Sequence, residues 1–218
     1  MAAAAPGRGP RPRAQAAHSH GRYPPAPLRG KKRPAADFRG RCLGLGGDDA
    51  AGRGPKGAVE LLLAEAYARR DHVALVAFRN SGADLLLPPT RSLVQTKRRL
   101  ASLPGGGGTP LAAGLKVALD LAHGARGRGL TPSIALLTDG RANIALDGSA
   151  NRAEAAHDAE RMARLARAQH VAALVIDMGA RPEPSLRGLA EIMAAPYIAL
   201  PRADAGRLSS AVSAALEV

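Results

Sequence analysis

Cysteine and aromatic residues are scarce in this sequence of 218 residues. It contains a single cysteine, Cys42, no tryptophan, two phenylalanines and three tyrosines. One cysteine excludes an internal disulfide bond, and a chain without disulfides is typical of the reducing cytoplasm. With so few aromatic rings, the sequence also lacks the stacking platforms on which single-stranded nucleic acids bind. We therefore expect a cytoplasmic protein that does not bind nucleic acid.

Long apolar runs are missing as well. No stretch approaches the roughly 18 to 20 apolar residues that a membrane-spanning helix needs. The first residues are basic, but no apolar core follows them, so they do not form a secretory signal. The sequence therefore predicts no membrane span.

Acidic residues are rare in the first quarter of the chain. The net charge is +13, but residues 1–55 hold 11 Lys and Arg against 3 acidic residues, whereas the remainder holds 20 against 15. Residues 1–55 also contain no Ile or Val, 8 of the 17 prolines and 10 of the 25 glycines. Such a segment cannot bury enough apolar surface to offset its chain entropy, so we expect a disordered, low-complexity basic segment. A basic tail that binds nucleic acid is the alternative interpretation of this segment.

From Lys56 onward the pattern changes to alternating helices and strands. The period of the apolar residues predicts helices at 56–71, 91–103, 110–129, 151–170, 183–195 and 204–216. Short apolar runs predict strands at 72–78, 84–89, 132–140 (with a turn at its end), 171–178 and 196–201. Uninterrupted apolar strands that alternate with helices indicate a mostly parallel sheet covered on both faces. Residues 56–218 are therefore expected to form an α/β domain.

Two loops that carry oxygen atoms follow from this arrangement. Thr109 ends the stretch PGGGGT before a predicted helix, and Asp139 directly follows the strand SIALLT. Ligands of such sheets lie at the carboxyl ends of the strands, and hydroxyl and carboxylate oxygens there suit Mg²⁺. Taken singly, Thr109 is typical of a helix N-cap and Asp139 of a turn before Gly140. The glycine-rich stretch lacks the GxxxxGK[ST] pattern, so a phosphate-binding P-loop is not expected.

Taken together, GGGGTPLAAG, LLTDGRAN and VIDM resemble the von Willebrand factor A domain. More narrowly, KGAVELLLAEAY, VALVAFR, LLLPPTRSL and LTDGRANI resemble the C-terminal domain of the D subunits of magnesium chelatases, over residues 56 to about 217. The resemblance implies a Rossmann-like von Willebrand factor A fold. It also implies that the chain holds at most the last third of such a subunit.

By this resemblance, the chain is a metal-dependent interaction module and not a catalytic centre. In the family a DxSxS loop, a Thr and an Asp hold a Mg²⁺ whose open position accepts an acidic side chain from a partner. Thr109 and Asp139 match the second and third of these elements. The implied partners are the ATP-hydrolysing I subunit and the porphyrin-binding H subunit, so ATP is used by the complex and is not bound by this chain. The implied pathway is chlorophyll or bacteriochlorophyll biosynthesis.

Three neighbouring residues have open interpretations. Arg141 and Asn143, next to Asp139, either orient the loop or contact a partner. Asp177 ends a predicted strand near the same edge, where it either supports the metal site or caps the strand.

The DxSxS loop and the strand before it do not appear in the sequence. They should lie just before Lys56, where PAADFRGRCLGLGGDDAAGRGP stands instead. We therefore expect the sheet to lack its first central strand, the polypeptide to be unstable or to aggregate, and Mg²⁺ binding to be weak or absent. Residues 37–55 read one nucleotide out of frame are compatible with IFVVDASGSAAMTRLAEA, which is a strand, a metal loop and a helix start. The hypothesis is that residues 1–55 are an out-of-frame translation.

Other functions stay open. The same motifs would suit a von Willebrand factor A domain of a cobalt chelatase or of another complex built around a ring ATPase. A stand-alone enzyme is disfavoured, because the sequence shows no nucleophile–base pair and no phosphate loop.

Overall fold

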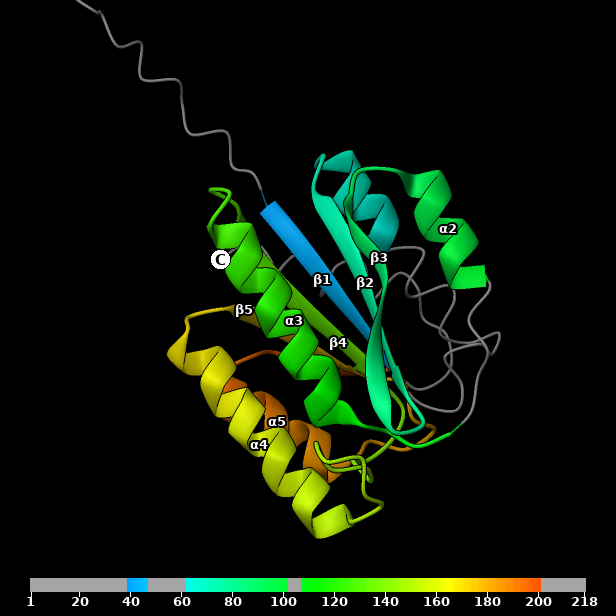
Figure 1. Cartoon of the computed structure of the whole chain (residues 1–218), viewed down its shortest axis with the longest axis vertical. Helices are drawn as coiled ribbons and strands as arrows, with labels where there is room; N and C mark the ends of the chain where they lie inside the picture. Colours follow the sequence, from blue (N-terminus) through cyan, green and yellow to red (C-terminus); the bar gives the residue numbers. More distant parts are fainter. Residues whose placement is uncertain (1–38, 47–61, 102–106, 201–218) are drawn as a thin grey trace, which may run out of the picture. The chain divides into compact units, whose positions relative to one another are not determined.

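The computed structural model describes residues 39–46, 62–101 and 107–200. They contain a six-stranded sheet with the order β3-β2-β1-β4-β5-β6 (Figure 1). The strands are β1 Arg39–Gly46, β2 His72–Arg79, β3 Gly82–Thr90, β4 Thr131–Thr138, β5 Ala172–Asp177 and β6 Tyr197–Ala199. Neighbouring strands are parallel, except that β2 and β3 are antiparallel. The predicted mostly parallel α/β sheet is confirmed.

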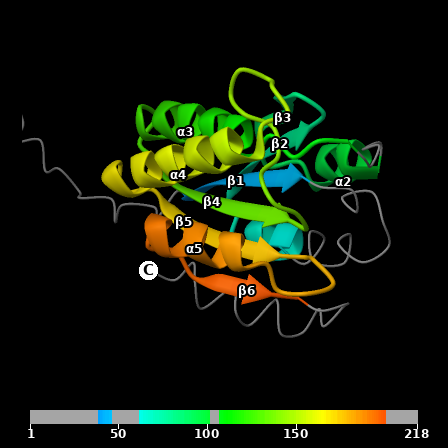
Figure 2. The same ribbon diagram turned by 90° about the horizontal axis from the view of Figure 1, so that it is seen from below.

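Helices cover both faces of this sheet. The described helices are α2 Leu93–Ala101, α3 Leu111–Arg126, α4 Arg152–Ala168, α5 Pro184–Met193 and a helix at residues 62–68. In Figure 2, α3 and α4 lie on one side of the sheet and the cyan helix at residues 62–68 lies on the other. The helix expected at 204–216 lies outside the described residues. No helix in the described ranges is both long and apolar enough to cross a membrane.

Alternating side chains of β2, β4 and β5 build two separate cores. Val76, Phe78 and Leu136 pack with the apolar faces of α3, α4 and α5. Leu75 and Leu137 point the other way and pack with the helix at residues 62–68. Because the strands are buried on both faces, their sequences read as continuous apolar runs, and for that reason they could be predicted.

The central position of the sheet is filled, and the prediction of a missing first strand is wrong. β1 lies between β2 and β4 and pairs with both, with Leu43 opposite Leu75 and Ala135 (Figure 1). Unpaired backbone groups on β2 and β4 would be costly, and the backbone of any extended segment can satisfy them. The expected disorder of residues 1–55 is therefore also wrong for Arg39–Gly46, and the expected aggregation loses its basis in a missing strand. Residues 1–38 and 47–55 lie outside the described part of the chain.

Glycine dominates the face of β1 that α3 covers. Gly44 is buried and lies opposite Val76 and Leu136, both of which belong to the α3 side of the core. A Cβ atom built at Gly44 would lie 3.5 Å from Cε1 of Phe78 and 3.6 Å from Cδ1 of Leu136. These are ordinary van der Waals distances, so an alanine fits at this position, whereas a longer side chain would meet Phe78 and Leu136.

β3 is an edge strand of the described sheet. It pairs with β2 through a register that shifts twice, between Val73 and Leu75 and between Leu75 and Val76. It contains Pro88 and Pro89, which have no backbone N–H to donate. Prolines of this kind are tolerated at a sheet edge and not inside a sheet.

Candidate functional site

Three loops meet at the carboxyl edge of the parallel strands. The Thr109 loop precedes α3, the Asp139 loop follows β4, and a third loop follows β5. A Cβ atom built at Gly140 would lie 3.7 Å from Oγ1 of Thr109, and one built at Gly179 would lie 3.2 Å from the carbonyl oxygen of Asp139. The structure thus brings the loops of Thr109 and Asp139 together at the edge where ligands of such sheets bind. That these two residues hold a metal stays a prediction.

The glycines before Thr109 let the loop pass through a narrow space. Gly107 has a φ of +105°, which favours glycine. A Cβ atom at Gly108 would lie 2.5 Å from both the carbonyl oxygen of Asn80 and Cγ1 of Ile144. Glycine is therefore needed at positions 107 and 108, because the chain there runs between the β2–β3 turn and the loop after β4.

Asn143 holds the backbone of Thr109 in place. The Thr109 N–H donates to Oδ1 of Asn143 over 2.6 Å, and the Asn143 N–H donates to the carbonyl oxygen of Thr109 over 3.3 Å. Of the two roles expected for Asn143, loop orientation is therefore the one with a visible contact. The simple N-cap interpretation of Thr109 is wrong, because Pro110 is the N-cap residue of α3 and no side chain caps this helix.

Arg141 connects the Asp139 loop to the start of α5. Its Nε lies 2.8 Å from Oε2 of Glu183, and the Arg141 side chain is 69% exposed, against 17% for Glu183. Glu183 is the N-cap of α5 and accepts from the N–H of Ser185 over 3.2 Å. Burial raises the pKa of Glu183, but hydrogen bonds from Arg141 and Ser185 outweigh it and hold the pKa below its usual value. The pair therefore joins two of the three loops through a carboxylate that stays charged.

Asp177 organises the third loop. Its buried carboxylate accepts from the N–H of Gly179 over 2.9 Å, from the N–H of Glu183 over 2.6 Å and from the hydroxyl of Tyr197 over 2.5 Å. With three donors, its oxygens serve the protein itself, which favours the strand-cap interpretation. Neither Glu183 nor Tyr197 was predicted as part of the site; the sequence signal for Glu183 is the Glu-Pro pair at the expected helix start.

Tyr197 makes the stability of this loop depend on pH. Burial and the hydrogen bond to Asp177 raise the pKa of Tyr197 to about 12, above the usual value of 10.0. Between these two values the unfolded chain loses the phenolic proton and the folded chain keeps it, so stability should fall as the pH rises from 10 towards 12. Urea titrations of the unaltered chain and of Tyr197→Phe should show a steeper loss for the unaltered chain over this range. Equal slopes would contradict the assignment.

The described residues at this edge do not form a complete Mg²⁺ site. Thr109 offers a hydroxyl and Asp139 a carboxylate, while Arg39–Gly46 contains no Ser, Thr, Asp or Glu. Among the residues that the structure describes, no group of three or more His, Cys, Asp and Glu could hold a metal ion. Mg²⁺ requires a near-octahedral set of oxygens, so two protein donors leave most of its shell to water. The described donor set alone does not fit a resident Mg²⁺.

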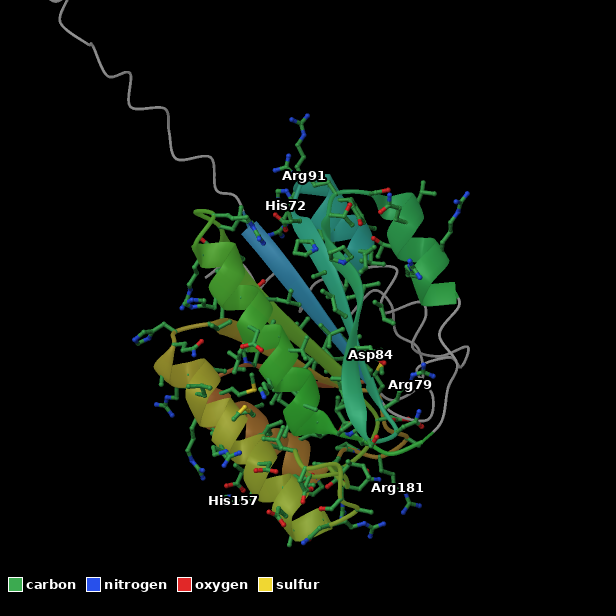
Figure 3. The ribbon with its side chains drawn as sticks, in the orientation of Figure 1. His72, Arg79, Asp84, Arg91, His157 and Arg181 are labelled. Atoms are coloured by element: carbon green, nitrogen blue, oxygen red, sulfur yellow. The ribbon has the colours of Figure 1, made fainter. Side chains whose placement is uncertain are left out.

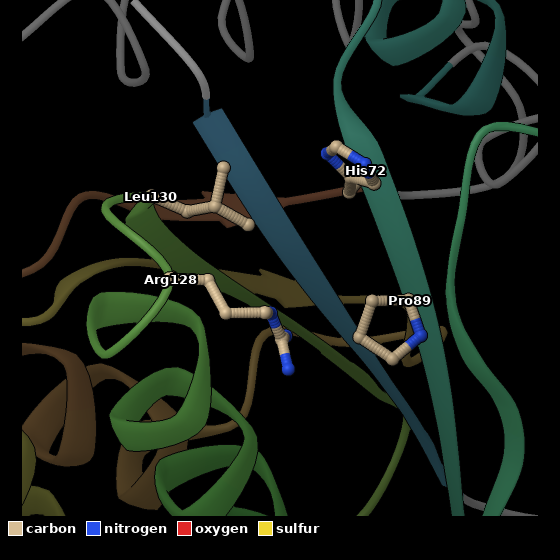
Figure 4. Close-up of a pocket in the computed structure, with 4 residues that line it drawn as sticks. All are labelled: His72, Pro89, Arg128 and Leu130. Carbon is tan, nitrogen blue, oxygen red and sulfur yellow. The ribbon is translucent and has the colours of Figure 1, made fainter. Parts of the chain in front are cut away.

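A second hollow lies at the opposite, amino edge of the strands. Figure 4 shows His72, Pro89, Arg128 and Leu130 around it, and Figure 3 shows His72 and Arg91 at one end of the molecule and Arg181 towards the other. Burial, Arg91 and Arg128 lower the pKa of His72, whose Nδ1 is buried and has no hydrogen-bond partner among the described residues. On β1, the residue that pairs with His72 at this edge is Gly40. The three loops at the carboxyl edge are the stronger candidate site.

Known proteins share the fold of this chain. Residues 55–141 match the family model of the von Willebrand factor type A domain. The fold is similar to the crystal structure of the SpRpn10 VWA domain, with a TM-score of 0.62, 14% identity and coverage of 81% of this chain and 95% of the other. That likeness shows the fold alone.

Magnesium-chelatase subunits are more similar in sequence. The chain is 66% identical over 161 residues to the 60 kDa subunit of Cereibacter sphaeroides and 37% identical over 169 residues to the 67 kDa subunit of Chlorobaculum tepidum. These matches cover 74% and 73% of the chain but 29% and 27% of the relatives, so the chain spans less than a third of their length.

A chain in a cryo-EM-based model of the BchI–BchD complex of magnesium chelatase is 40% identical, with a TM-score of 0.53 and coverage of 84% of this chain and 98% of that one. Sequence, family model and fold agree on the same assignment. The chain belongs to the magnesium-chelatase D-subunit family, in which it corresponds to the von Willebrand factor type A region.

Proposed function

We propose that the chain is the C-terminal interaction module of a magnesium-chelatase D subunit. It docks with the ATPase I subunit and the porphyrin-binding H subunit during the ATP-driven insertion of Mg²⁺ into protoporphyrin IX, in chlorophyll or bacteriochlorophyll biosynthesis. The complex uses ATP, and this chain contributes no catalytic residue. The names of the relatives and the BchI–BchD complex support the I subunit as a partner.

The observation that carries this proposal is the meeting of three loops at one edge of the sheet. Thr109 and Asp139 supply oxygens there, Asn143 fixes the first loop, and Arg141 adds an exposed positive charge. An edge of this kind attracts an acidic side chain of a partner through the guanidinium group.

Docking by this chain is weakened, because part of the metal-binding loop is missing. The DxSxS sequence is absent, and β1 ends in Gly46 opposite Thr138, directly before Asp139. The out-of-frame origin of residues 1–55 accounts for this loss and for the composition of the segment. Sequencing of the gene across codons 30 to 60 tests it; an intact frame with codons that exclude the shifted reading would end the hypothesis.

Binding to purified I subunit tests the docking function. The unaltered chain should bind the I subunit, and Arg141→Glu should weaken binding about ten-fold or more, or ~1.4 kcal/mol. Arg167→Glu is the matched control. Arg167 lies in the last turn of α4, at the end of the helix that is far from the three loops, so its replacement should leave the affinity unchanged. Surface plasmon resonance with the full chain measures both. A folded chain that does not bind the I subunit would refute the proposal.

A further inference from the structure

An apolar groove continues from the candidate site between α4 and α5. Its volume is about 420 Å³. It begins at Leu111 and Arg141, which lie two residues after Thr109 and Asp139, respectively. The floor is formed by Leu111, Leu186 and Leu189, whose exposed fractions are 5% or less. The groove is therefore a continuation of the three-loop edge and not a separate cavity.

Small residues keep the groove open. Ala153 and Ala156 on α4 and Gly188 on α5 line it and are at least partly exposed. A Cβ atom built at Gly188 would have no atom within 4 Å. Glycine inside a helix costs stability relative to alanine, so the glycine at this position gives α5 no advantage as a helix. The absence of a side chain at Gly188 instead leaves the groove open beside α5.

The walls of the groove are fixed in advance. Asn151 caps α4 by accepting from the N–H groups of Ala153 and Glu154. Glu183 caps α5, and Pro184 begins it. Both helices therefore start at the carboxyl edge with their orientation set, and a partner would not have to order them on binding.

Charge is distributed unevenly along the groove. Arg141 and Arg152 line the end near the three loops, where the N-termini of α4 and α5 also favour negative charge. Glu160 lines the groove further along α4 and pairs with Arg164. The ion pair between Arg141 and Glu183 involves an arginine that is 69% exposed, so an incoming carboxylate can compete for it.

We propose that this groove, which we call the α4–α5 groove, seats a bulky aliphatic side chain of the I subunit. This inference rests on the proposed function and names the chemistry of the docking segment. An acidic residue of that segment meets the three-loop edge with Arg141 and Arg152, and a Leu, Ile or Met close to it fills the space beside Gly188. Buried apolar anchors beside a charged contact are the common form of a binding hot spot.

Filling the groove from inside tests the proposal. Gly188→Leu places a side chain in the open space and replaces glycine by a better helix former, so the melting temperature should be unchanged or higher. Gly124→Leu is the matched control, because Gly124 is also a helical glycine with no atom within 4 Å of a built Cβ, and it lies exposed on α3, away from the groove. Binding of each full-length variant to purified I subunit should be at least ten-fold weaker for Gly188→Leu and unchanged for Gly124→Leu.

The outcomes are distinct. If the unaltered chain does not bind the I subunit, the proposed function fails and this inference fails with it. If the unaltered chain binds and Gly188→Leu binds equally well, the docking function stands and the groove is not the docking site. If Gly188→Leu and Gly124→Leu weaken binding to the I subunit equally, the groove is also not the docking site. Should Gly188→Leu not melt cooperatively, Ala156→Leu on the exposed face of the opposite wall decides by the same measurement.

Discussion

Replacing residues 37–55 by IFVVDASGSAAMTRLAEA should give a chain that binds Mg²⁺ at least ten times more tightly and unfolds at a higher temperature. The new loop adds a carboxylate and two hydroxyls next to Thr109 and Asp139, and these oxygens replace water in the shell of the cation. Isothermal titration with Mg²⁺ and a thermal melt of both chains measure the two effects.

The structure also indicates where the restored strand would lie. β1 ends with Gly46 opposite Thr138, directly before Asp139. Counted from residue 37, the aspartate of the replacement stands at position 41, five residues before Gly46, so it reaches the level of Thr138 only if the restored strand shifts its register by five residues along β2 and β4. This shift brings IFVV to the places that residues 42–45, Gly44 among them, occupy now. Replacing glycine by a branched residue in a central strand should add about 1 kcal/mol of stability.

A variant of the restored chain separates the metal effect from the strand effect. With alanine in place of the aspartate of DASGS, the strand is kept and one carboxylate is lost. This control should melt like the restored chain without Mg²⁺ but bind the cation more weakly. A restored chain that neither melts later nor binds Mg²⁺ more tightly would contradict the out-of-frame hypothesis.

Asp177→Ala should cause the largest loss of stability of any single substitution at the carboxyl edge. It leaves the N–H groups of Gly179 and Glu183 and the hydroxyl of Tyr197 without their acceptor. The acceptor is a buried carboxylate, and a hydrogen bond to a charged group contributes about 1.5–3 kcal/mol, so the loss of three partly buried bonds should cost about 3 kcal/mol or more. Urea titration of the purified variant measures it.

Asp158→Ala is the comparison for this prediction. Asp158 is also buried, but its carboxylate accepts from one backbone group, the N–H of Leu146, and pairs with the exposed Arg161. Its loss should therefore cost clearly less than that of Asp177. If both substitutions cost the same, the three hydrogen bonds of Asp177 do not determine the stability of the loop.

The strands β2, β4 and β5 could be predicted because burial on both faces leaves an uninterrupted apolar sequence. β1 could not, since RGRCLGLG contains three glycines, which are depleted in strands, and no β-branched residue. Its position is determined by its neighbours: β2 and β4 both present backbone groups to the space between them, and backbone pairing does not depend on the side chains.

The sequence predicts that the loops of Thr109 and Asp139 lie at one edge of the sheet, but not the hydrogen bonds that hold them there. Thr109 and Asp139 stand out because each borders a predicted element at the carboxyl edge. The hydrogen bonds from Thr109 to Asn143 and from Tyr197 to Asp177 join residues 34 and 20 positions apart, which no local pattern reveals. The N-cap position was placed one residue early because Pro110 itself occupies it, with a ψ of 65° that is not helical.

The two prolines of β3 have a consequence for self-association. An extended segment of another molecule that tried to lengthen the sheet beyond β3 would find no hydrogen to accept from at Pro88 and Pro89. Leu85 of the same strand is 44% exposed, so this flank would otherwise be attractive for fibril growth. The two prolines thus prevent further molecules from adding strands at this edge of the sheet.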